Sequence, residues 1–276
     1  MRLACSSYSF PLLTLEQSAQ LAAMLGFRFL DLGTQPGKTV CLAPAEVEAD
    51  PGGVADRLLR IAELWGLGYP DLFTVLAEPL NSPSLAARQA NGERFAAHLR
   101  LCRQAGIAGL TLMPGPLWPD LGYERSLRFC AEELSRLLAW AGEADVRLSI
   151  EAHAESIVED PERALELLQR VPGLKLTLDY AHFVYLGVPT ARVHELLPYA
   201  AHCHARQAAR GQMQAIWQEG EIDFEDVVGR LAARGYRGFV SLEYVWAERW
   251  GNNRLDTLSE TILLRDRLLR SPHVEL

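Results

Sequence analysis

Four ionisable residues in the second half of the chain each stand at the end of a short apolar run. They are Glu151, Asp179, His204 and Glu243. Short apolar runs between longer amphipathic segments predict buried parallel strands, and ligand sites form at the carboxyl ends of such strands. Three carboxylates and one imidazole suit Mn²⁺, Mg²⁺ or Co²⁺ better than a structural zinc site, which prefers Cys and His. The sequence therefore predicts one divalent-metal site.

A simpler interpretation of each residue also exists. A carboxylate that follows a strand is often only a helix N-cap or a surface charge. Four such residues on consecutive strands favour a shared site, because three carboxylates that face one another need a cation to offset their charge. Four protein ligands also leave positions in an octahedral shell for water or a bidentate substrate.

The whole chain alternates short apolar runs with longer amphipathic ones. Strands that alternate with helices predict βαβ units, and eight of them in 276 residues predict a (β/α)₈ TIM barrel in a single domain, residues 1–276. An open doubly wound sheet would normally carry GxGxxG or GxxxxGK[ST], and neither motif occurs. The expected strands are 3–8, 28–33, 71–76, 110–113, 147–151, 174–179, 201–204 and 238–243, and the expected helices are 14–26, 54–65, 84–105, 123–141, 160–169, 190–197, 223–234 and 253–269.

Local signals support several of these boundaries. Thr14 and Gln17 have the spacing of a capping box, and Asp160-Pro161 has the order of an N-cap followed by a first helical residue. The segment 34–53 is rich in proline and glycine, so we expect a long loop there that serves as a lid or an oligomer contact.

The bulk composition excludes several classes of protein. Hydrophobic residues make up 49% and charged residues 22%, as in ordinary globular proteins. The net charge of −8 disfavours a general nucleic-acid binder, because an acidic surface repels phosphate. No apolar run reaches membrane-spanning length, and we identify no signal peptide. Five widely spaced cysteines without a CxxC pair indicate buried thiols in a reducing cytoplasm.

Five segments together resemble the xylose isomerase-like sugar phosphate isomerase/epimerase superfamily. The resemblance covers nearly the whole chain and is specific for the fold and the metal site. It implies one bound divalent ion, with Mn²⁺ expected and Mg²⁺, Co²⁺ or Zn²⁺ as alternatives. It also implies a sugar or polyol-derived small-molecule substrate and the option of a homo-oligomer. The segments are Ile150–His153, Leu178–His182, His202–His204, Gly220–Phe224 and Leu242–Glu243.

The same resemblance assigns roles to particular residues. In ketose 3-epimerases and hydroxypyruvate isomerases the two metal-bound glutamates are the acid/base pair, which implies Glu151 and Glu243 here. The histidine of the DxxH segment, His182, is expected to touch a substrate oxygen. An arginine six residues after the metal-binding histidine, Arg210, is expected to bind substrate. Such a site removes a proton beside a carbonyl and forms a metal-stabilised enediolate.

Some assignments stay open. His153 lies two residues beyond Glu151, so both side chains would share one face of a strand. His153 then contacts substrate or supports a metal ligand, or it is a loop histidine bound to backbone. Arg206 competes with Arg210 for the substrate role. His202, two residues before His204, is expected to be structural or to support the metal ligand.

Three other functions compete with isomerisation. A metal-dependent lyase of inosose or dehydroshikimate dehydratase type would use the same metal and a glutamate base, but would expel water. A nuclease of endonuclease IV type would need extra histidines after the second and third strands and a DxH pair, and the sequence has neither. An accessory subunit is disfavoured because all four expected ligands are present.

Overall fold

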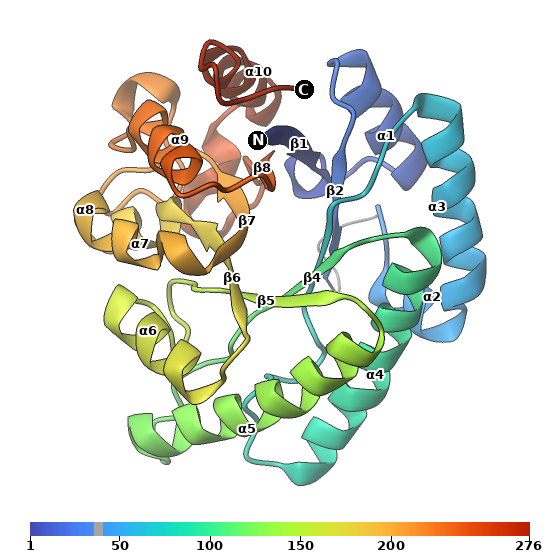
Figure 1. The fold of residues 1–276 in the computed structure, drawn as a ribbon, viewed down its shortest axis with the longest axis vertical. Helices are drawn as coiled ribbons and strands as arrows, with labels where there is room; N and C mark the ends of the chain where they lie inside the picture. Colours follow the sequence, from blue (N-terminus) through green and yellow to red (C-terminus); the bar gives the residue numbers. More distant parts are fainter. Residues whose placement is uncertain (36–40) are drawn as a thin grey trace.

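The eight apolar runs form short parallel strands that pair in sequence order and close into a barrel (Figure 1). The computed structural model describes residues 1–35 and 41–276. β1 closes the barrel against β8, with Leu3 paired to Val240. The expected TIM barrel is therefore confirmed. The strands are β1 Arg2–Ser6, β2 Leu30–Thr34, β3 Asp71–Thr74, β4 Gly109–Leu112, β5 Arg147–Glu151, β6 Lys175–Asp179, β7 Ala200–Ala205 and β8 Phe239–Leu242.

Helices surround the barrel and bury their apolar faces against it (Figure 1). This layering is the usual solution for parallel strands, which need cover on their outer face. Among the described residues the helices are α1 Leu15–Met24, α2 Pro44–Ala49, α3 Pro51–Trp65, α4 Leu85–Ala105, α5 Gly122–Glu143, α6 Pro161–Arg170, α7 Tyr180–Tyr185, α8 Thr190–Val193, α9 Phe224–Ala233 and α10 Thr257–Leu268, with 3₁₀ turns at Ser7–Ser9, His194–Tyr199, Trp217–Glu219 and Arg249–Arg254.

Side-chain hydrogen bonds to the backbone confirm two of the expected helix starts. Thr14 and Gln17 form the reciprocal capping box at the start of α1. The Asp160 side chain accepts a hydrogen bond from the backbone N–H of Arg163 at 2.8 Å, and Pro161 is the first residue of α6. These caps satisfy backbone donors that a helix start leaves unpaired.

The prediction of a long loop over 34–53 is wrong for the second half of that segment, which is helical. α2 begins at Pro44 and α3 at Pro51, with the Asp50 side chain capping α3 through Gly53 N at 2.9 Å. Proline breaks a helix interior but suits its first turn, where its missing N–H has no partner to lose. Residues 36–40 of the expected loop lie outside the described residues.

Several expected boundaries also shift: the strand expected over 71–76 stops at Thr74, and the helix expected over 190–197 continues as a 3₁₀ helix from His194. The first strand ends at Ser6 rather than at residue 8, because Ser7–Ser9 turn into a 3₁₀ helix that the Ser6 side chain caps. The last helix begins at Thr257 rather than at residue 253, because Asp256 supplies the side-chain cap. The early end of the first strand carries Tyr8 over the mouth of the barrel.

The barrel interior is unusually polar. Asp31 of β2 meets His202 of β7, and Thr111 of β4 meets Thr177 of β6 at 2.6 Å. These strands are not neighbours in the barrel, so the contacts cross its interior. Barrel interiors are usually filled by branched apolar residues. The polar layer therefore calls for a reason beyond packing.

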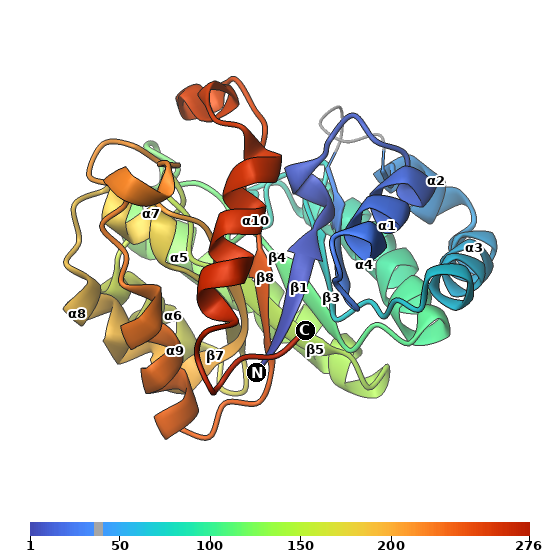
Figure 2. The same cartoon turned by 90° about the horizontal axis from the view of Figure 1, so that it is seen from above.

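The chain ends meet at the end of the barrel away from the site (Figure 2). The amino group of Met1 donates to the carbonyl of His273 at 2.7 Å, and Leu3 N–H donates to Glu275 O at 2.8 Å. The five cysteines are buried and not joined in disulfides. Within residues 1–35 and 41–276, no helix has the length and apolar character needed to cross a membrane.

Candidate metal and substrate site

Glu151, His204 and Glu243 converge at the carboxyl end of the barrel. His204 Nδ1 lies 2.7 Å from Glu151 Oε1 and 3.2 Å from Glu243 Oε2. All three side chains are buried, and one ligand atom from each lies within 4.8 Å of the others. The ends of β5, β7 and β8 bring them together, because alternate residues of each strand point inward.

The first strand supports this cluster in a way that sequence reasoning missed. Ser6 Oγ donates to Glu243 Oε1 at 3.1 Å and fixes that carboxylate. Tyr8 lines the same pocket, and its hydroxyl has no hydrogen-bond partner among the described residues. The Tyr8 ring lies against Gly33, where any Cβ would collide with it. The only sequence signal was the position of these residues at the end of the first strand.

The charges of the cluster are strongly coupled. Burial lowers the pKa of His204, but the carboxylates of Glu243 and Glu151 outweigh it and hold that pKa well above its usual range. Burial raises the pKa of Glu151, but the neighbouring imidazoles of His182 and His204 hold it well below its usual range. In the absence of a metal, a proton on His204 therefore provides the positive charge between two carboxylates.

Asp179 lies beside this cluster rather than in it. Its Oδ2 pairs with the Arg206 guanidinium at 2.8 Å, and its Oδ1 accepts a hydrogen bond from Ala181 N–H at 2.8 Å. His182 Nε2 stands 3.6 Å from both Asp179 Oδ2 and Glu151 Oε2. Burial raises the pKa of Asp179, and Arg206 opposes that rise. His182 thus lies between Asp179, the expected fourth ligand, and the cluster of Glu151, His204 and Glu243.

His153 forms one wall of the pocket together with His182. The centroids of the two rings are 3.8 Å apart. Burial and the neighbouring His182 lower the pKa of His153 to about 3, so the ring is neutral at physiological pH. Its Nδ1 lies 2.7 Å from the carbonyl of Ala154, which can only accept. Nδ1 therefore carries the proton, and Nε2 is an acceptor for a hydroxyl group.

The structure separates the two arginines expected to compete for substrate. Arg210 is exposed, and its backbone N–H donates to Glu221 at 3.3 Å. Arg206 is buried, lines the pocket, and has an Nε without a partner among the described residues. The structure thus brings Arg206 to the site and leaves Arg210 outside the pocket. Sequence spacing alone could not show which arginine turns inward.

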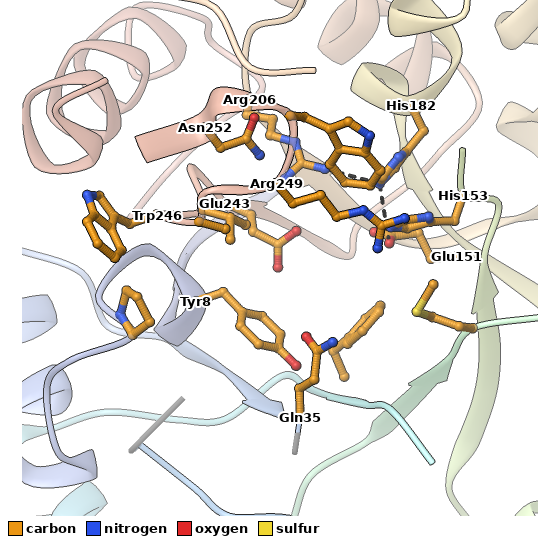
Figure 3. A pocket seen from close by; sticks show the side chains of 16 residues that line it. Tyr8, Gln35, Glu151, His153, His182, Arg206, Glu243, Trp246, Arg249 and Asn252 are labelled. Carbon is orange, nitrogen blue, oxygen red and sulfur yellow. Dashed lines mark hydrogen bonds and ion pairs between the residues drawn. The ribbon is translucent and has the colours of Figure 1, made fainter. Parts of the chain in front are cut away.

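A segment after β8 covers part of the pocket. Arg249 forms an ion pair with Glu155 in the loop after β5, and Trp250 Nε1 donates to the same carboxylate at 3.2 Å. The Trp250 ring stands 5.7 Å from the His153 ring. Figure 3 shows the side chains around the pocket. Its lining is Tyr8, Pro11, Gln35, Phe73, Met113, Glu151, His153, His182, Arg206, Glu243, Val245, Trp246, Ala247, Arg249, Trp250 and Asn252.

The donor set fits a divalent cation. Two buried carboxylate groups face one imidazole nitrogen, and burying such charges without a cation is costly. Asp179 Oδ2 adds a third carboxylate one histidine away. Oxygen-rich sets with one imidazole suit Mn²⁺, Mg²⁺, Co²⁺ or Zn²⁺.

Solved structures with the same fold cover the chain almost end to end. The IOLI protein, solved with a bound zinc atom, matches with a TM-score of 0.76 at 16% identity and covers 97% of both chains. A D-tagatose 3-epimerase-like protein matches at 0.75 and 19%, again over 97% of both chains. The probable 3-DHS dehydratase AsbF from Bacillus anthracis matches at 0.73 and 17%, covering 97% of this chain and 100% of its own. At these identities the likeness establishes the fold.

Sequence comparison identifies the family. A putative hydroxypyruvate isomerase from Homo sapiens is 33% identical over 91 residues, which is 32% of this chain and 32% of that protein. The chain thus spans about a third of the length of the curated relatives it matches. The model of the xylose isomerase-like TIM barrel family matches residues 19–266, nearly the whole chain. The protein therefore belongs to the xylose isomerase-like TIM barrel family.

Proposed function

We propose that the protein is a divalent-metal-dependent isomerase or epimerase of a small sugar or sugar-like hydroxy ketone. One observation carries this proposal: Glu151 and Glu243 line the same pocket and approach the same His204 nitrogen. Two carboxylates on different sides of one bound molecule can remove a proton from one carbon and return it to another.

Glu151, His204 and Glu243 would hold the ion, with Asp179 as the fourth ligand. When bound, the ion supplies Lewis-acid stabilisation of the negative charge that develops on the substrate oxygen. The carboxylates of Glu151 and Glu243 then exchange the proton with the substrate carbon. Ser6 keeps the Glu243 carboxylate oriented during this exchange, because it donates to Oε1.

Other pocket groups would hold the substrate oxygens. The neutral His153 accepts from a hydroxyl, and the buried Arg206 donates from its unpartnered Nε. His182 lies between Glu151 and Asp179 and lines the pocket, where it can contact a substrate oxygen beside the metal ligands. The Trp250 ring stands beside His153 on this side of the pocket. The relatives support a hydroxy-ketone substrate, since they include a putative hydroxypyruvate isomerase and a 3-epimerase-like protein.

The test is proton exchange with solvent. The Mn²⁺-loaded protein is incubated in heavy water with hydroxypyruvate and a panel of ketoses, and the products are examined by NMR. Deuterium beside the carbonyl supports the proposal. Glu151→Gln and Glu243→Gln should each remove the exchange, while Glu260→Gln, a buried carboxylate outside the pocket, should retain it. Full exchange in Glu243→Gln would exclude the two-glutamate mechanism.

Dehydration is the second candidate, and the likeness to a probable 3-DHS dehydratase favours considering it. The same glutamate base would remove the proton, but a β-hydroxyl would leave as water. Product mass separates the two reactions. An isomer keeps the mass of the substrate, whereas a dehydratase product is lighter by one water and often absorbs in the near ultraviolet.

A further inference from the structure

A carboxylate–histidine pair lies one layer below the candidate metal site. Asp31 Oδ2 of β2 is 2.5 Å from His202 Nε2 of β7 and 3.8 Å from His204 Nε2. Asp31 and His202 are buried, and neither lines the pocket. They therefore cannot touch a substrate, and packing alone does not explain a charged residue in the centre of a barrel.

The short distance defines what this pair is. Two acceptors do not approach to 2.5 Å, so a proton lies between Asp31 and His202. A metal ion bound by both would hold its ligand atoms about 3 Å apart, given bonds of about 2.1 Å. The pair is therefore a hydrogen bond rather than a second metal site. It leaves the Asp31 carboxylate with acceptor capacity to spare, and its Oδ1 has no partner among the described residues.

His204 is the second imidazole close to Asp31, and it can donate a hydrogen bond to that carboxylate. Its Nδ1 faces Glu151 and Glu243, which makes Nδ1 the nitrogen available to a metal. A metal-binding imidazole carries its proton on the other nitrogen and donates it to a carboxylate, a carbonyl or water. Nε2 of His204 faces Asp31, 3.8 Å from Oδ2, and Oδ1 of the same carboxylate has no other partner among the described residues.

We propose that Asp31 is a positioning residue for the metal site: it holds His204 with the proton on Nε2 and Nδ1 turned toward the ion. His202 fixes Asp31 in turn through the 2.5 Å hydrogen bond. This inference rests on the metal site of the proposed function. It explains why the barrel interior is polar at this point. An apolar residue at position 31 would leave the Nε2–H of His204 without a hydrogen-bond acceptor.

The experiment compares Asp31→Leu and the isosteric Asp31→Asn with Asp71→Asn. Asp71 is the matched control, because it also lies in the interior, accepts from Thr111 at 2.6 Å and pairs with Arg147, yet is not in contact with His204. Metal affinity is titrated without substrate, and the ring nitrogens of His204 are followed by ¹⁵N NMR in the Zn²⁺-loaded protein. Melting curves establish that each variant is folded.

We expect Asp31→Leu to weaken metal affinity by about 10- to 100-fold, the usual effect of losing such a partner. In the same variant His204 Nε2 should keep its proton but lose the signature of a hydrogen bond to a carboxylate. Asp31→Asn, which keeps an acceptor oxygen, should weaken binding less, and Asp71→Asn should match the wild type. If Asp31→Leu does not fold, Asp31→Asn carries the comparison.

Two other outcomes overturn the proposal in distinguishable ways. A wild type that binds metal while the folded Asp31 variants bind it equally well, with unchanged His204 signals, refutes the role of Asp31 alone. A wild type that takes up no Mn²⁺, Co²⁺, Mg²⁺ or Zn²⁺ refutes both this role and the metal site of the proposed function.

Discussion

Arg206 Nη2 lies 2.8 Å from Asp179 Oδ2, so a permanently charged guanidinium already pairs with the carboxylate expected to be the fourth metal ligand. The two residues come from adjacent strands, since Asp179 ends β6 and Arg206 follows β7. Arg206 is buried, and its charge acts through a medium that screens it poorly. An incoming divalent ion must therefore share Asp179 with Arg206.

The first prediction concerns metal affinity. Arg206→Met removes a buried positive charge beside an expected ligand and should tighten Mn²⁺ binding by at least about tenfold, since nearby charges interact by several kcal/mol at partly buried sites. Arg210→Met is the control, because Arg210 is exposed and should leave the affinity unchanged. Calorimetric titration measures both. Weaker Mn²⁺ binding in Arg206→Met would show that Arg206 supports the ion rather than competing with it.

The second prediction uses the same pair of variants for substrate binding. At saturating metal, Arg206→Met should raise KM by about tenfold or more, because a hydrogen bond to a charged group contributes about 1.5–3 kcal/mol. Arg210→Met should change KM little, since its side chain is outside the pocket. Steady-state kinetics with the substrate found by proton exchange decides the matter. The reverse result would assign the substrate role to Arg210.

The third prediction concerns pH. Carboxylate neighbours hold the pKa of His204 well above 6.5, so its contribution to metal-free stability is complete below about 6.5 and is lost as pH rises through the folded-state pKa. Glu151 behaves in the opposite way. Its pKa is lowered in the folded protein, so its contribution to stability is present above about 4.5 and is lost as pH falls through the folded-state pKa. A metal must displace the His204 proton, so metal binding should strengthen as pH rises.

Thermal melting between pH 5 and pH 9 measures this, once with a chelator and once with saturating Mn²⁺, a range chosen to span roughly the usual histidine pKa. The gap between the two melting temperatures should widen toward high pH. A His204→Gln variant should lose most of the pH dependence of that gap. A gap that is constant with pH in the wild type would contradict competition between proton and metal at His204.

The strand pattern was sufficient to predict the fold, because apolar runs of four to six residues alternate with amphipathic helices along the entire chain. It also indicated which side chains meet, since inward-pointing residues at the carboxyl ends of barrel strands converge at the mouth. The structure brings Glu151, His204 and Glu243 together on that basis. Helix starts were readable because caps such as Thr14 are local hydrogen-bond chemistry.

What the sequence did not reveal depends on contacts between distant residues. The pairing of Arg206 with Asp179, and that of Asp31 with His202, need the register of neighbouring and opposite strands. Tyr8 enters the pocket only because the first strand stops early at Ser6. The helix at Pro44 was missed because proline punctuates loops and also begins helices, and composition does not separate these uses.

The fourth prediction tests the unpaired hydroxyl of Tyr8. Burying a hydroxyl without a partner is costly, so Tyr8→Phe should leave stability unchanged or raise it by about 1 kcal/mol. The same change should raise KM by roughly three- to tenfold if this hydroxyl donates to substrate. Tyr69→Phe is the matched control with the opposite sign, because its hydroxyl donates to Leu58 O at 3.0 Å and its loss should lower stability. Unchanged KM in Tyr8→Phe would remove Tyr8 from the substrate contacts.

The fifth prediction concerns the segment that covers the pocket. Glu155 and Trp250 both have left-handed backbone, with φ of 67° and 58°, a conformation that non-glycine residues adopt only when their surroundings hold them. The Glu155 carboxylate supplies that hold, because it pairs with Arg249 and accepts from Trp250 Nε1. Losing it should let the segment open and expose the wall formed by His153.

Glu155→Ala should therefore raise KM by about two- to fivefold, a modest effect because the ion pair is exposed and such pairs contribute at most about 1 kcal/mol. Added salt should raise the wild-type KM toward that of the variant, since salt screens exposed charges. Glu159→Ala is the control, because Glu159 pairs with Arg163 away from the pocket lining and should leave KM unchanged. If Glu155→Ala and Glu159→Ala behave alike, the cover over the pocket is held by the packing of Trp250 against His153 and Tyr185, and Trp250→Ala becomes the variant that opens it.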